Sequence, residues 1–231
     1  MKISKYIRLI NALFVLQILV AGPFAGNVFG QTKTEEQPKT PEQTKSVTQV
    51  MVQAAQVNNF VQRFDDKFLI NLALQRNDSE TKEMLFLSNS LGYVAYAVPA
   101  ALMVGGIVRH DSEMRQNALY TGSSAVVTLG FTLLIKTIFK RRRPFVQNLK
   151  IVSVYNAGST SFPSGHSSTS FAVATALSRA YPKWYVIVPS YLWAGSVAYS
   201  RMYLGVHYPS DVFGGALLGT TTSLLLRPAI K

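Results

Sequence analysis

Two long stretches without a charged residue constrain the fold of this chain more than any other feature of its sequence. Residues 84–108 are 25 uncharged positions in a row, and residues 116–135 are 20. A helix needs roughly 20 predominantly apolar residues to cross the ~30 Å hydrocarbon layer of a membrane. Both stretches are therefore predicted to be membrane-spanning helices. The alternative is that they are buried helices of a soluble, all-helical domain.

Three shorter uncharged stretches follow towards the C-terminus. They cover residues 167–178, 184–200 and 212–226, and tyrosine and tryptophan residues flank them, as is common where a helix meets the membrane–water interface. No strand-like alternation of apolar and polar residues interrupts this pattern. We therefore expect an all-α fold, a helical bundle with five to six transmembrane helices and a membrane-embedded domain over residues 84–231.

The N-terminal part of the chain differs in composition from the rest. Residues 1–30 combine a basic start with an apolar run and small residues before Gln31, so they are either a cleaved signal peptide or a first transmembrane helix. Residues 31–50 are polar and contain two prolines, which predicts a linker. Residues 51–80 place apolar side chains at helical spacing, which predicts an amphipathic helix on a protein or bilayer surface.

The charge of the chain is unevenly distributed. A net charge of +12 indicates an anionic partner, such as nucleic acid, an anionic membrane surface or a phosphorylated substrate. From residue 114 onward there are twelve basic residues and one acidic residue, Asp211. A single carboxylate in so basic a segment is expected to have a specific role. The absence of cysteine excludes disulfides, thiolate metal sites and cysteine nucleophiles.

Three clusters of polar residues lie near predicted helix ends. If the chain starts inside and the predicted helices cross the membrane in turn, all three clusters lie on the same, outer side. The first contains Lys136 and Arg143, seven residues apart, which project to one side if the helix continues and together suit a tetrahedral anion. The second, residues 163–166, has the composition of a turn that leads into a helix. Free N–H groups at a helix start point at an anion, and Gly165 permits close approach.

The third cluster runs from Ser200 to Asp211. His207 and Asp211 are four residues apart, so they are neighbours on one face if the segment is helical. A carboxylate on one imidazole nitrogen fixes the tautomer and leaves the other nitrogen free as a nucleophile. Arg201 supplies a further cation for the same anion.

These residues together fit a phosphoryl transfer reaction. His207 can attack phosphorus with Asp211 behind it, and His166 can protonate the departing oxygen as a general acid. No metal or other cofactor is expected, because the chain offers no acidic cluster to hold a metal. The candidate ligands of the phosphate oxygens are Lys136, Arg143, Ser164, Gly165 and Arg201, with Ser164 and Gly165 contributing backbone amides.

The three clusters resemble the signature of the type-2 phosphatidic acid phosphatase superfamily, which reads K-x6-RP, PSGH and SR-x5-H-x3-D. Every signature position matches, and the order and gaps fit as well. The resemblance implies a six-helix bundle with its active site at the outer membrane face, His207 as the nucleophile and a reaction without metal. It does not cover residues 31–83.

The sequence therefore predicts a membrane phosphatase that hydrolyses a phosphomonoester or pyrophosphate of a lipid through a phosphohistidine intermediate. Phosphatidic acid, phosphatidylglycerol phosphate, isoprenyl pyrophosphate and lipid A phosphates are all open as substrates. We expect a multi-pass protein of a bacterial inner membrane, with the site facing the periplasm or exterior and no nucleic-acid partner. The alternatives are a soluble secreted acid phosphatase with the same signature, a vanadate-dependent haloperoxidase and a lipid-binding protein with a decayed site.

Two further sets of residues are expected to lie outside the catalytic machinery. The second long apolar stretch is followed by three basic residues, Lys140, Arg141 and Arg142. The predicted order of membrane crossings puts them on the outer side, although basic residues usually lie on the inner side. We expect them to attract anionic lipid headgroups rather than to bind the reacting phosphate. His110 is expected to be solvated in an inner loop.

Overall fold

The structure is a computed structural model that describes residues 60–158 and 160–226. These residues form helices and connecting loops and contain no strand, which confirms the expected all-α fold. The predicted segments 1–30 and 31–50, and the first nine residues of the predicted helix 51–80, lie outside the described residues. An α-helical segment covers residues 60–74. It is followed by α3 (Asp78–Val108), α4 (Ser112–Phe139), α5 (Pro144–Gln147), α6 (Gly165–Ala180), α7 (Trp184–Tyr203) and α8 (Pro209–Leu226).

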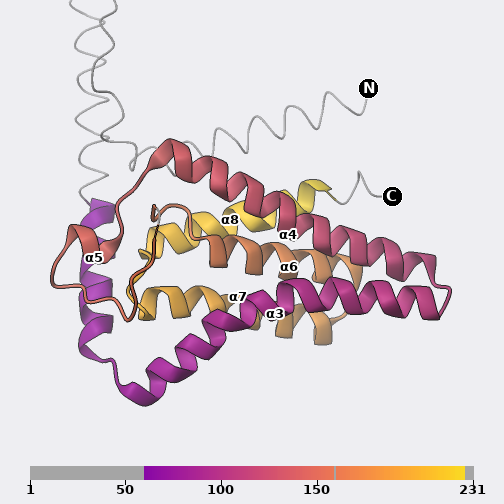
Figure 1. Cartoon of the computed structure of the whole chain (residues 1–231), viewed down its shortest axis with the longest axis horizontal. Coiled ribbons are helices and arrows are strands. Elements are labelled where there is room, and N and C mark those ends of the chain that lie inside the picture. The colour runs from indigo at the N-terminus through magenta and orange to yellow at the C-terminus, as the bar shows by residue number, and fades with distance from the viewer. Residues whose placement is uncertain (1–59, 159, 227–231) are drawn as a thin grey trace, which may run out of the picture.

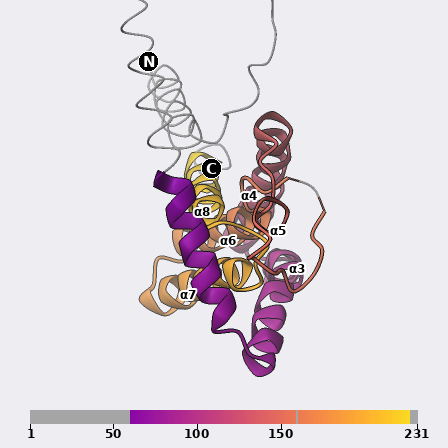
Figure 2. The same ribbon diagram turned by 90° about the vertical axis from the view of Figure 1, so that its left-hand side faces the viewer.

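Five of the helices run alongside one another, and the segment 60–74 crosses their ends. Figure 1 shows α3, α4, α6, α7 and α8 in one bundle, with the indigo segment 60–74 at its left side. The view from that side in Figure 2 shows the same segment lying across the bundle end. Within the bundle α6 is central, because it packs against α4, α7 and α8.

The closest helix contact joins α6 to α8. A Cβ atom added at Gly219 of α8 would lie 1.9 Å from the carbonyl oxygen of Ser168, and one at Gly215 would lie 2.6 Å from that of Ser164. Only glycine lets the two backbones approach this closely. The contact fixes the N-terminus of α6 against the first turns of α8, so that two of the three signature clusters lie next to each other.

Substitution of Gly219 by valine is expected to destabilise the bundle, because the added side chain must push α8 away from α6. Overpacking of this kind costs about 3 kcal/mol. The thermal midpoint in detergent should fall clearly below that of the wild type. Gly130→Val on α4 is the matched control, since a Cβ at Gly130 meets nothing within 4 Å. Equal midpoints for the two variants would contradict the close contact.

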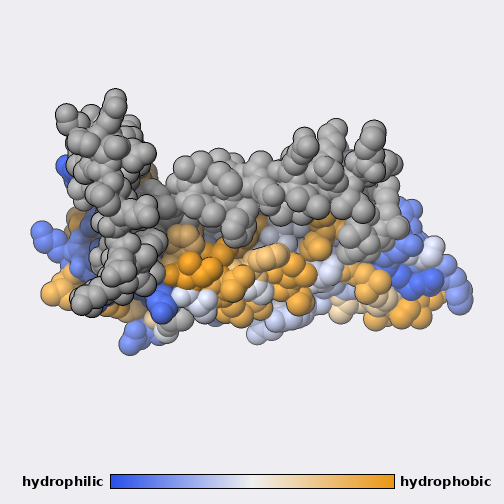
Figure 3. Space-filling view, turned by 90° about the horizontal axis from the view of Figure 1, so that it is seen from above, coloured by the Kyte–Doolittle hydropathy of each residue, from blue (hydrophilic) through white to orange (hydrophobic). Residues whose placement is uncertain are grey.

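The bundle exposes large apolar side chains on its outside. The helix α3 and the stretch Ser112–Gln147 are long and apolar enough to cross a membrane. Of the 18 most apolar consecutive residues in each, only 11% and 39% are buried inside the protein. Figure 3 shows apolar surface between hydrophilic ends on the face that it displays. Contiguous exposed apolar surface favours lipid contact over the core of a soluble protein. Among the described residues, two helices are long and apolar enough to span a membrane, so the expected number of five to six transmembrane helices stays a prediction. Exposed examples are Phe86, Tyr93, Tyr96, Val126, Leu133, Leu192 and Phe213.

Candidate active site

The three signature clusters meet at one end of the bundle, at the left in Figure 1. The loop after α4 is tied to the segment before α6, because the Ser161 N–H donates to the Arg141 carbonyl oxygen over 2.8 Å. The start of α6 is tied to α8, because the Ser164 N–H donates to the Asp211 carbonyl oxygen over 3.1 Å. The fold therefore brings the predicted site residues to one place.

Lys136 and Arg143 do not share a helix, although their spacing suggested that they could. The helix α4 ends at Phe139, and Lys140 adopts the left-handed conformation with φ 43°. Arg143 lies beyond this break in extended backbone, immediately before Pro144 of α5. A loop, rather than two helical turns, carries Arg143 back towards the bundle.

Backbone carbonyl groups hold the two cations in place. The Lys136 ammonium donates to the carbonyl oxygens of Thr160 and Ser161, at 2.5 and 3.3 Å. The Arg143 guanidinium donates to the carbonyl oxygens of Gly158 and Val206, each at 2.8 Å. Guanidinium and ammonium groups fixed in advance lose little entropy when they bind an anion.

His207 is presented with the tautomer that a nucleophile needs. The Arg143 Nη1 lies 3.2 Å from the His207 Nε2. Because a guanidinium only donates, Nε2 must be the acceptor, and the ring proton is assigned to Nδ1. Nδ1 faces the Asp211 Oδ2 at 3.5 Å. Burial lowers the pKa of His207, against the opposing effect of Asp211, so the ring is neutral at pH 7.

Asp211 is the centre of a buried hydrogen-bond network. Its Oδ2 accepts from the Ser161 hydroxyl and, over 2.9 Å, from the Tyr208 N–H. Its Oδ1 accepts from Arg141 over 2.6 Å. The single acidic residue of the C-terminal half is thus fully buried and held by several donors. A carboxylate fixed in this way can orient the imidazole beside it.

Positive charge accumulates around His207. Burial and the neighbouring Arg201 lower the pKa of Arg143. Lys136 also interacts electrostatically with Arg143 and Arg201. Arg201 is buried, donates to the Ser88 hydroxyl of α3 and lies over the Tyr155 ring at 5.6 Å. Three cations that repel one another at one place favour the binding of a multiply charged anion.

The segment before α6 binds other parts of the chain through Ser164. Ser164 is the N-cap of α6, where its side chain accepts from the Ser167 N–H, and its own N–H is used by Asp211. The Ser164 amide is therefore engaged in the fold, and its binding of a phosphate oxygen stays a prediction. A Cβ at Gly165 would have only an ordinary contact, 3.7 Å to Thr132 Cγ2. The close approach of a ligand to Gly165 stays a prediction.

His166 lies in the first turn of α6, within the electrostatic reach of the other site residues. Charges on Arg201, His207 and Arg143 act on its ring. His166 therefore lies within electrostatic range of His207, and its role as an acid on the other side of one phosphorus atom stays a prediction.

Two buried charged residues of this region were missed by the sequence analysis. Arg141 was expected to face lipid headgroups, but it is buried and pairs with Asp211 and with Asp65 of the segment 60–74. Lys140 and Arg142 are exposed, as expected. The sequence did contain a sign for Asp65. It lies four and seven residues before Leu69 and Leu72, so it shares the buried face of their helix.

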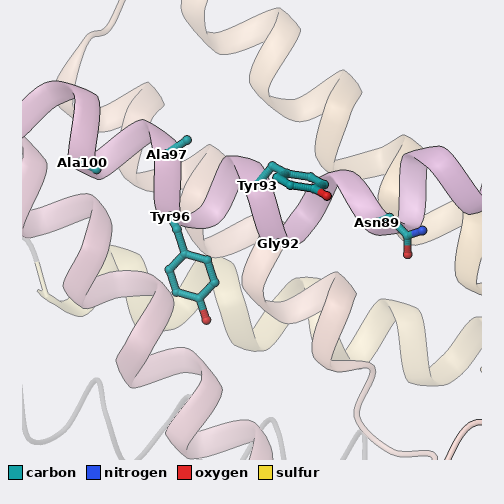
Figure 4. A pocket seen from close by; sticks show the side chains of 6 residues that line it. All are labelled: Asn89, Gly92, Tyr93, Tyr96, Ala97 and Ala100. Carbon is teal, nitrogen blue, oxygen red and sulfur yellow. The ribbon is translucent and has the colours of Figure 1, made fainter.

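An open groove of about 710 Å³ lies elsewhere, along α3. Figure 4 shows its six lining residues on that one helix, with the Tyr93 and Tyr96 rings projecting from it. None of the lining residues belongs to the three signature clusters. The groove is therefore a feature of the outer surface of α3.

Comparison with known proteins agrees with this arrangement. Residues 117–230 match the model of the PAP2 superfamily, and the matched range includes all three clusters. This segment of the chain belongs to that family. A TM-score of 0.63 relates it to the crystal structure of a transmembrane PAP2 type phosphatidylglycerolphosphate phosphatase from Bacillus subtilis, over 94% of both chains at 19% identity.

Two curated relatives are phosphatases of polyprenyl lipids by name. The decaprenylphosphoryl-5-phosphoribose phosphatase of Mycobacterium tuberculosis is 37% identical over 48% of this chain and 60% of its own length. The undecaprenyl-diphosphatase BcrC of Bacillus subtilis is 26% identical over 66% of this chain and 76% of its own length. The chain spans 60% to 66% of the length of the first curated relatives it matches.

Proposed function

We propose that this PAP2 protein is a phosphatase that hydrolyses a phosphate ester or pyrophosphate of a membrane lipid without a metal ion. The observation that carries the proposal is the placement of His207, whose Nε2 lies 3.2 Å from the Arg143 guanidinium and whose Nδ1 faces Asp211. An imidazole held in this tautomer beside a cation is suited to attack a phosphorus atom whose oxygens the cation binds.

In the first step, the lone pair on Nε2 attacks phosphorus and the bond between phosphorus and the lipid oxygen breaks. Arg143 donates to Nε2 in the structure, so this hydrogen bond is transferred to a phosphate oxygen, which frees the Nε2 lone pair for the N–P bond. Lys136 and Arg201 balance the remaining phosphate charge. His166 gives its proton to the departing oxygen, and the bound phosphate favours the protonated form of that ring.

In the second step, water attacks the phosphohistidine and the N–P bond breaks. His166 is neutral after the first step, so it can accept the proton of the attacking water. Inorganic phosphate leaves, and Nε2 of His207 regains its lone pair. The positive charge that the His207 ring carries in the intermediate is offset by the Asp211 carboxylate.

A lipid substrate is supported by the surface of the bundle and by the relatives. Large apolar side chains cover the outside of α3 and α4, while the cationic site lies at the helix ends. A bundle immersed to its ends in a bilayer would present this site at headgroup depth. Both curated relatives named above act, by their names, on phosphates of polyprenyl lipids.

The topology follows from the same reasoning. We infer a multi-pass protein of a bacterial inner membrane, in which residues 84–231 form the phosphatase domain. The site end would face the periplasm or exterior, and the loop between α3 and α4, with Arg109 and Arg115, would face the cytoplasm.

Phosphate release from a panel of substrates in detergent tests the function. The panel contains polyprenyl pyrophosphate, phosphatidylglycerol phosphate, phosphatidic acid and a soluble phosphate ester. We expect at least one lipid to be hydrolysed faster than the soluble ester, with a rate that a chelator leaves unchanged. Preference for the soluble ester would remove the lipid assignment, and a chelated enzyme rescued by a divalent ion would contradict the metal-free reaction.

A further inference from the structure

Arg141 joins the catalytic carboxylate to a second carboxylate from outside the family segment. Its Nη1 donates to Asp211 over 2.6 Å, and its Nη2 donates to Asp65 over 2.9 Å. Asp65 and Asp211 are fully buried, and Arg141 is 7% exposed. Charge-assisted hydrogen bonds to two different carboxylates restrain the guanidinium at both Nη atoms, and Ser210 and Gln62 accept from it as well, over 2.8 and 3.0 Å. The position of Asp211 therefore depends on where Asp65 holds Arg141.

The segment 60–74 is anchored firmly enough to serve as this support. Its buried Leu69 packs with Ile151 and Tyr208, and its buried Leu72 packs with Tyr203 and Leu204. Ile151 lies in the loop after α5, Tyr203 ends α7, and Leu204 and Tyr208 lie between α7 and α8. The segment is thus docked on both loops that surround the signature residues, as its place across the bundle end in Figure 2 indicates.

Asp65 also binds the first turn of α8. It accepts hydrogen bonds from the Ser210 N–H, over 3.1 Å, and from the Ser210 hydroxyl. The Arg141 guanidinium lies 4.0 Å from the centre of the Tyr208 ring. Tyr208 and Ser210 both lie within the turn that connects His207 to Asp211. A displacement of Asp65 would therefore be transmitted directly to that turn.

We propose that Asp65 is a positioning residue of the active site, which acts through Arg141 to hold Asp211 and, through it, the attacking imidazole of His207. The proposal rests on the phosphatase function proposed above. It extends the working site beyond residues 117–230 to the helix that precedes α3. Asp65 does not touch the phosphate, since Arg141, Asp211 and His207 separate it from the attacking Nε2.

The role predicts an effect on the chemical step rather than on substrate binding. Asp65→Asn keeps the shape and one acceptor but removes the charge that balances Arg141. We expect kcat and the single-turnover rate of His207 phosphorylation to fall about tenfold, as for the partners that orient a histidine elsewhere. KM should stay within about twofold, because Lys136 and Arg201 are untouched.

The matched control is Asp78→Asn, the same change in the first turn of α3. Asp78 is exposed, whereas Asp66 binds Gln62, which itself accepts from Arg141 over 3.0 Å. The control should keep the wild-type kcat and KM. A kcat of Asp65→Asn equal to that of the control, or a loss confined to KM, would overturn the positioning role.

A double-mutant cycle in the full chain keeps the test valid if the single variant folds poorly. Replacement of a buried ion pair by a neutral pair is often tolerated, so Asp65→Asn combined with Arg141→Gln is expected to fold. If Asp65 acts through Arg141, Asp65→Asn lowers kcat by less than about twofold in the Arg141→Gln background. A further tenfold loss in that background would contradict the proposed route.

The two proposals fail differently. A wild-type protein that hydrolyses none of the lipid or soluble phosphates overturns both. An active wild type with an unaffected Asp65→Asn variant overturns the positioning role alone and leaves the phosphatase function standing.

Discussion

Replacement of His207 by asparagine is expected to lower kcat by at least about 10⁴-fold, because it removes the atom that forms the covalent bond to phosphorus. The amide of asparagine has no nucleophilic nitrogen, yet its NH₂ group can still donate towards Asp211. The three cations around the site are unchanged. Binding of phosphate or vanadate, measured by calorimetry, should therefore persist within a few-fold of the wild type.

The control for this variant is His110→Asn. His110 is exposed in the loop between α3 and α4 and has a positive φ of 53°, which asparagine tolerates. Its activity should equal that of the wild type. A His207→Asn protein with more than a few per cent of wild-type turnover would remove His207 as the nucleophile.

Replacement of Arg143 by lysine is expected to lower kcat/KM about 10²-fold, although the charge is kept. Arginine spans the carbonyl oxygens of Gly158 and Val206 and still reaches the His207 Nε2. An ammonium group is a single point of charge that cannot make these contacts together. The lysine variant should therefore bind the phosphate less well in the transition state, which is measured from the initial rates at low substrate concentration.

Arg142→Lys is the matched control, because Arg142 is the exposed neighbour on the same loop. It should keep kcat/KM within about twofold of the wild type. If the two lysine variants lost activity equally, the general charge of the loop would explain the effect and the specific geometry of Arg143 would not.

The helical architecture was predictable because long runs without charge leave few folds open. Residues 84–108 and 116–135 lie within α3 and α4, and the PSGH cluster leads into α6 with Ser164 as its cap. Helix starts depend on local residue types, such as a capping serine, so the sequence carries this information.

The path of the chain between helices was less predictable. The helix α4 stops at Phe139, before it reaches Arg143, and Lys140 takes a left-handed conformation that lysine rarely favours. Arg143 is held in place by carbonyl groups at residues 158 and 206, which are distant in the sequence. Tertiary contacts of this kind leave no local pattern.

The support of Asp211 was missed for the same reason. Arg141 lies among four consecutive basic residues, and nothing in that run separates the buried members from the exposed ones. Its partners Asp65 and Asp211 lie 76 and 70 residues away. The one local sign was an acidic residue in phase with the buried leucines of its helix, which marks a position that needs a buried cation.

The central claim is that the reaction passes through a phosphorylated His207. It is tested most directly by mixing the enzyme with a labelled lipid phosphate, quenching with alkali during the first turnover and mapping the label by mass spectrometry of peptides. The account predicts phosphate on His207, formed and lost at rates no slower than kcat. Product release without any label on the protein, or label on another residue, would contradict it.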